Sequence, residues 1–143
     1  MDFRVHRKTA ELGGSTQYVE VGPGRYSGEH WQDGFLFVRE DAFGVAEGIV
    51  TKHFPGYSHF GTNDVSVDVG RAVIAEWRDV AGRLATMNIE QVCDALHLDA
   101  AYRDYDIAEI DSHRSEIARM LIDLADRCEA FYEQEEWVCV LGV

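Results

Sequence analysis

The chain is poor in cysteine, proline and basic residues, and it contains no long apolar run. Only 3 cysteines and 2 prolines occur among its 143 residues. Cys93, Cys128 and Cys139 are odd in number and widely spaced, which excludes a disulfide framework and a CxxC motif. Each lies among apolar neighbours, so we expect three small buried residues in a reducing compartment.

The first residues and the apolar segments also exclude two classes of protein. Residues 1–8 lack the apolar core of a signal peptide. No segment approaches the roughly 20 apolar residues that a membrane span requires. We therefore expect a cytoplasmic protein that does not enter a membrane.

Negative charge is abundant and unevenly distributed. Lys and Arg number 13 against 26 Asp and Glu, which gives a formal net charge of −13. Residues 1–70 hold 10 acids and 6 bases, a net of −4, whereas residues 71–143 hold 16 acids and 7 bases, a net of −9. A charge of this size repels nucleic acids and anionic membranes and attracts basic surfaces. The second half is therefore the more negative half.

The first half has the pattern of short strands separated by glycine-rich turns. Alternating or continuous apolar residues predict strands at 3–9, 18–21, 35–38, 49–54 and 65–69. The segment 35–38 is apolar on both faces, which predicts a central strand covered on each side. The glycines from Gly22 to Gly28 have the spacing G-x-G-x-x-x-G and no amphipathic helix follows them, so we expect no dinucleotide site.

The second half changes to a helical period. Apolar residues three or four positions apart predict a helix over about 70–87. Asn88 and Gln91 form a capping-box pattern before a short helix. Residues 98–111 fit either a helical turn or a loop. The longest helix is predicted to begin near Asp111 or Ser112 and to bury one stripe, namely Ile117, Met120, Leu121, Leu124, Cys128 and Phe131.

Residues 137–141 then predict a final strand that returns to the sheet. The whole chain, residues 1–143, is therefore expected to form a single α+β domain. In this domain an antiparallel sheet from the N-terminal half is packed by about three helices of the C-terminal half, with a final C-terminal strand.

Carboxylates form two candidate binding surfaces in the second half. On the longest helix, one group projects opposite the apolar stripe and consists of Asp123, Asp126, Glu129 and Glu133. The other group combines acids with tyrosines between the helices and consists of Asp99, Tyr102, Asp104, Tyr105, Asp106 and Glu109. Tyrosines supply buried area at an interface, and carboxylates steer a cationic partner. A solvated face on an acidic protein is the simpler interpretation.

Catalytic and metal-binding patterns are weak. There is no G-x-S-x-G motif, and the apolar surroundings of the cysteines disfavour a nucleophilic thiol. His53 and His59 lie in an aromatic loop, 53–61, with Asp64 nearby. The two histidines are six positions apart, with Pro55 between them, and this spacing fixes no metal geometry. We expect no cofactor and no metal. A small metal- or ligand-dependent enzyme that uses His30, His53, His59 and Asp64 is the alternative.

In its general profile the chain resembles the immunity proteins of bacterial toxin–immunity pairs, including contact-dependent inhibition systems. The shared features are small size, one acidic α+β domain, no catalytic motif and patches of carboxylate and tyrosine, here the two groups of residues named above. The resemblance implies a protein that binds and neutralises a basic toxin domain such as a nuclease. A protein-binding adaptor that inhibits nothing is a further alternative.

Overall fold

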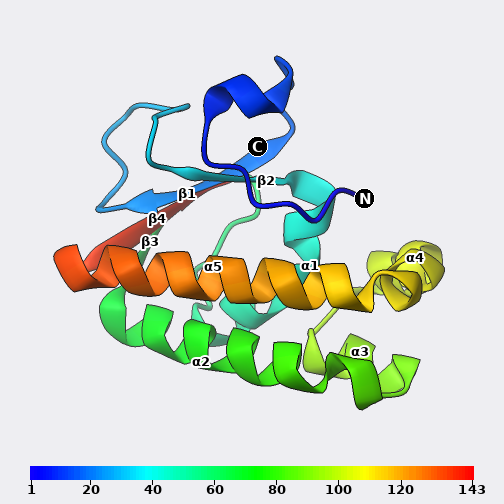
Figure 1. The fold of residues 1–143 in the computed structure, drawn as a ribbon. Coiled ribbons are helices and arrows are strands. Elements are labelled where there is room, and N and C mark those ends of the chain that lie inside the picture. The colour runs from blue at the N-terminus through cyan, green and yellow to red at the C-terminus, as the bar shows by residue number, and fades with distance from the viewer.

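Four antiparallel strands form the centre of the fold in the computed structural model, which describes residues 1–143 (Figure 1). They are β1 (Tyr18–Pro23), β2 (Leu36–Arg39), β3 (Thr62–Ser66) and β4 (Trp137–Leu141), in the spatial order β2-β1-β4-β3. The last strand, β4, lies between β1 and β3, with Leu141 opposite both Glu20 and Thr62. The predicted C-terminal strand is confirmed, and it occupies the middle of the sheet.

Five α-helices accompany the sheet, which confirms the α+β class. They are α1 (Glu40–His53), α2 (Val67–Arg83), α3 (Ile89–Ala95), α4 (Ile107–Ser112) and α5 (Arg114–Gln134). Shorter 3-10 turns span Thr9–Leu12 and Leu84–Thr86, and a π-helical turn spans Tyr102–Asp106. Helices α2 and α5 run side by side in opposite directions below the sheet (Figure 1). None of the helices combines the length and the apolar content that crossing a bilayer requires.

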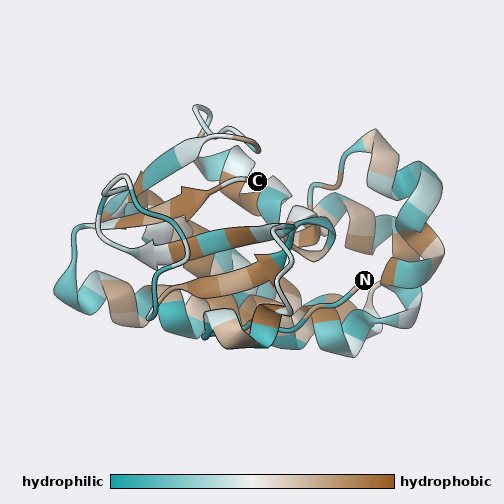
Figure 2. Ribbon diagram, turned by 90° about the horizontal axis from the view of Figure 1, so that it is seen from above, coloured by the Kyte–Doolittle hydropathy of each residue, from teal (hydrophilic) through white to brown (hydrophobic).

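The two faces of the sheet are covered differently. On the inner face, valines of β1, β3 and β4 pack with Leu36 and Val38 of β2. Together they form a large core shared with α1, α2 and α5. There Trp77 of α2 donates its indole N–H to the Ala46 carbonyl of α1 at 3.0 Å. The outer face carries a smaller cluster, which includes Tyr18, Phe37 and Leu141. Figure 2 views the ribbon from above, the side on which this face lies. The outer face is therefore covered by turns and loops instead of helices.

Residues 49–54 are the main correction to the predicted elements, because they belong to α1 and its C-cap and form no strand. Helix α1 is buried around much of its circumference, so it lacks the contrast between polar and apolar faces that marks an amphipathic helix. Its two glycines also resemble strand breakers in the sequence. A side chain at Gly44 would overlap the Tyr102 ring, and one at Gly48 would overlap the carbonyl oxygens of Leu96 and His97.

The other differences concern boundaries and the chain's first residues. Residues 3–9 form no strand and share only one bridge with the sheet, between His6 and Phe37. Strand β2 is buried on both faces as expected, but it is an edge strand of the sheet and not a central one. The predicted strand 65–69 ends at Ser66, where α2 begins.

The helical predictions hold with shifted ends. The Asn88–Gln91 capping box is present, with Gln91 N–H donating to Asn88 Oδ1 at 2.9 Å. Helix α5 begins at Arg114, after Asp111 and Ser112, and no side chain caps it. Its predicted stripe is buried apart from Phe131, which is half-buried. Residues 98–111 are largely helical and include the π-helical turn.

Candidate functional site

A hollow of about 540 Å³ beside α1 brings together carboxylates from segments far apart in the sequence. We name it the acidic pocket. Its lining residues come from α1, from the loop after α1 and from residues 99–102, where the π-helical turn begins. They are Glu40, Asp41, Glu47, His59, Phe60, Asp99 and Tyr102. No lysine or arginine lines it. Four carboxylates therefore face one concave surface with a single histidine among them.

His59 is held between two glutamates of α1. Its Nε2 lies 2.9 Å from Glu40 Oε1, and its Nδ1 lies 2.7 Å from Glu47 Oε1. Ionised carboxylates only accept hydrogen bonds, so both ring nitrogens donate and the ring carries a positive charge. Burial disfavours that charge, but the bonds to Glu40 and Glu47 outweigh burial and raise the pKa of His59. The pair of glutamates is thus balanced by a cation that can lose its proton.

The rim of the acidic pocket combines an apolar side chain with a fixed wall. Phe60 is 73% exposed and contacts the His59 ring edge-on. Tyr102 forms the wall, and its hydroxyl donates to the Asp41 carbonyl at 2.9 Å. Burial, together with the charges of Glu47 and Asp41, raises the pKa of Tyr102. Aromatic residues are enriched at protein interfaces, and polar groups accessible to solvent surround them there.

The acidic stretch predicted at 99–109 adjoins this pocket and divides into inward and outward residues. Asp99 accepts the N–H of Tyr102 at 3.2 Å, so both residues serve the pocket wall. Asp104 is exposed, and Tyr105 is 85% exposed. Asp106 is half-buried, and Glu109 pairs with the amino group of Met1.

The carboxylates predicted on α5 are distributed over two sides of the helix. Asp126 and Glu129 both bind Arg78 of α2, whose Nη2 lies 2.9 Å from Asp126 and 2.6 Å from Glu129. Glu133 lines a hollow of about 330 Å³ between α2 and α5, together with Arg71 and Arg78. Arginine from the neighbouring helix therefore offsets much of the charge on this side.

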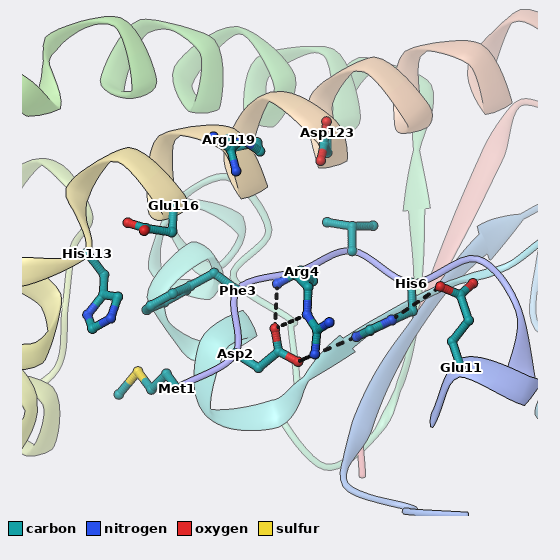
Figure 3. A pocket seen from close by; sticks show the side chains of 11 residues that line it. Met1, Asp2, Phe3, Arg4, His6, Glu11, His113, Glu116, Arg119 and Asp123 are labelled. Carbon is teal, nitrogen blue, oxygen red and sulfur yellow. Dashed lines mark hydrogen bonds and ion pairs between the residues drawn. The ribbon is translucent and has the colours of Figure 1, made fainter. Parts of the chain in front are cut away.

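Asp123 faces a different groove, of about 370 Å³, between α5 and the first residues of the chain (Figure 3). Arg119 and Asp123 extend from α5 toward this segment, where Asp2 pairs with Arg4 at 2.7 Å. The hydrogen bonds from Arg4 hold the pKa of Asp2 well below its usual range. Acids and bases alternate around the groove, so it has no single sign of charge.

The histidines of the alternative enzyme hypothesis do not share a site. His30 bonds Glu20 at 2.8 Å on the outer face of the sheet, His53 bonds Glu76 of α2 at 3.1 Å, and His59 lies in the acidic pocket. Asp64 accepts the N–H of Tyr26 at 2.9 Å. The structure contains no group of three or more His, Cys, Asp or Glu side chains arranged to hold a metal ion.

The sequence did not single out Glu40, Asp41 and Glu47. All three lie in α1, whose sequence has no clear helical pattern. One signal was present: Glu40 and Glu47 are seven residues apart, which places them on the same face of a helix. Their approach to His59 and Asp99 depends on tertiary packing.

No family model, no curated protein and no solved structure matches the chain.

Proposed function

We propose that this protein binds a basic protein domain through the acidic pocket and the adjoining stretch 99–109, and neutralises it as an immunity protein neutralises its toxin. One observation carries the proposal: four carboxylates line a concave surface that contains no lysine or arginine. Such a surface favours the guanidinium or ammonium group of a partner, because a carboxylate binds either one in a charge-assisted hydrogen bond.

The mode of inhibition follows from the charge of the partner. A nuclease toxin holds nucleic-acid phosphates with arginine and lysine. Carboxylates of the acidic pocket would occupy the same basic side chains and so exclude the substrate. Phe60, exposed at the rim, supplies apolar area that would be buried in the complex. The net charge of −13 adds long-range attraction, so association should be fast and should slow as salt is raised.

The test uses the protein encoded directly upstream of this chain, purified with and without it. We expect a stoichiometric complex in which the partner's toxic activity is lost. The double substitution Glu40→Gln and Glu47→Gln removes two charges and keeps side chains of the same shape. Loss of charge pairs from the centre of an interface should weaken binding about 100-fold.

The matched control is Asp126→Asn with Glu129→Gln, which likewise removes two carboxylates that share one cation, here Arg78. The affinity of this variant for the partner should stay within about threefold of that of the unchanged protein. Charges at the rim of an interface, or already neutralised by a neighbour, contribute little to affinity. Equal sensitivity of both variants would reject the pocket as the interface. A complex that forms without loss of the partner's activity would instead support the adaptor interpretation.

A further inference from the structure

The loop between β1 and β2 folds over the outer face of the sheet and forms a hydrogen-bonded chain of three side chains. Glu20 Oε1 lies 2.8 Å from His30 Nδ1, and His30 Nε2 lies 3.0 Å from the Tyr26 hydroxyl. The second oxygen of Glu20 accepts the N–H of Trp31 at 2.8 Å. None of these residues lines the acidic pocket.

Glu20 is an unusual residue to find at its position. It is 2% exposed, and its neighbours across the strands are Phe37 on β2 and Leu141 on β4. Burial of a carboxylate between apolar residues is costly unless the charge is bonded, and a neutral glutamine could accept the Trp31 N–H equally well. The charge itself therefore points to a role for its bond with His30.

Trp31 follows His30 in the chain, bonds the same carboxylate and adopts a strained backbone conformation. Its φ of 59° lies in the left-handed region, which a bulky residue rarely adopts. Stacking on Phe37, with ring centroids 5.9 Å apart, and the bond to Glu20 keep it there. Strained residues of this kind concentrate where a fold must place a functional group accurately.

The hydrogen bonds fix the direction of proton transfer. An ionised Glu20 only accepts, so in the neutral form of His30 the proton lies on Nδ1 and Nε2 is free to accept from Tyr26. A nucleophile bonded to a base that is oriented by a third group is the arrangement of a nucleophilic triad. His30 is 41% exposed and Tyr26 is half-buried, so a small reagent can reach both from solvent.

We propose that Tyr26 is a nucleophilic phenol that accepts an acyl group from an activated ester, with His30 as its general base and Glu20 as the positioning residue. In this step the Tyr26 proton passes to His30 Nε2 while the phenol oxygen forms a bond with the acyl carbon. The bond from that carbon to the leaving oxygen breaks, and the leaving group takes the proton from His30. The product is an O-acyl tyrosine, and no oxidant or metal is required. An uncharged acyl donor also suits a protein of strongly negative charge.

The test treats the full chain with 4-nitrophenyl acetate and measures acetylation of each tyrosine by peptide mass spectrometry over time. Tyr105 is the internal control, because it is 85% exposed and has no histidine bonded to its hydroxyl. General-base assistance should make Tyr26 react about 100-fold faster than Tyr105. Hydroxylamine should release the label, as it does from phenyl esters. If Tyr105 reacts as fast as Tyr26 or faster, exposure governs reactivity and the proposal is wrong.

Two variants separate base catalysis from simple exposure. His30→Gln should reduce the rate at Tyr26 to that of Tyr105 or below, and an unchanged rate would overturn the proposal. Glu20→Gln keeps the bond to Trp31, but its amide donates to Nδ1 and moves the His30 proton to Nε2. It should therefore lower the rate at Tyr26 and shift the ¹⁵N NMR signals of His30 to the other tautomer. If Glu20→Gln fails to fold, the exposed position His30 decides the question alone.

Discussion

Two pairs of carboxylates in this protein each surround one cation, and the identity of that cation separates them. In the acidic pocket Glu40 and Glu47 enclose His59, whereas at the α2–α5 contact Asp126 and Glu129 share Arg78. Arginine keeps its charge at every pH that a folded protein experiences. The second pair is therefore neutralised permanently, and the first pair only while His59 keeps its proton.

The charged residues around the two pairs of carboxylates also differ. The acidic pocket adds Asp99 and Asp41, and only Asp41 has an arginine near it, with Arg39 Nε at 3.7 Å. No arginine or lysine lines this pocket, while the hollow beside Glu133 contains both Arg71 and Arg78. Counting carboxylates along the sequence therefore ranks the two regions wrongly for binding a basic partner. What matters is the charge left after each acid has met its neighbours in the fold.

The largest predicted effect concerns the packing that builds the acidic pocket. Gly48→Ala places a methyl group against the backbone carbonyls of Leu96 and His97, which cannot move as a side chain can. We expect a loss of about 2–3 kcal/mol in the free energy of unfolding, typical of overpacking. Urea denaturation measures it. The control is Gly82→Ala in α2, where no atom lies within 4 Å, and which should stabilise the protein by about 0.5 kcal/mol.

If Gly48→Ala were as stable as the unchanged protein or more stable, α1 could shift away from residues 96–102. In that case the acidic pocket would not be a fixed feature of the fold, and the comparison with the α5 side would lose its basis.

The same packing explains what the sequence could and could not predict. Helices α2 and α5 have one apolar stripe each, so their period of three to four residues is visible in the sequence. Helix α1 is covered on several sides, and its glycines serve close contacts with residues some 50 positions away. The acidic stretch 99–109 was visible because its acids lie within a few residues of one another in the sequence. The neutralisation of Asp126 by Arg78 could not be predicted from the sequence, because the two residues are 48 positions apart.

The second prediction concerns the pH dependence of the acidic pocket. The pKa of His59 is raised in the folded state. The charged ring therefore contributes its full stabilisation of the fold below the ordinary pKa of 6.5, and this stabilisation is lost as pH rises through the pKa of the folded state. The unchanged protein should therefore exceed His59→Gln in stability by about 1–2 kcal/mol at pH 6, from two charge-assisted bonds. The difference should shrink toward pH 9, as measured by urea denaturation at both pH values. A difference that grows with pH would contradict the assignment of the charge.

The smallest predicted effect concerns the α2–α5 side and tests the comparison from the other direction. Arg78→Gln removes the cation shared by Asp126 and Glu129, a partly exposed pair of contacts worth less than about 1 kcal/mol. Because arginine does not titrate, this loss should be the same at pH 6 and pH 9, unlike that of His59→Gln. The substitution also frees two carboxylates on α5. If the partner binds the acidic pocket, its affinity should stay within about threefold, since distant surface charges act weakly through salt. A marked gain in affinity would instead place the interface on α5, with Arg78 as the residue that limits it.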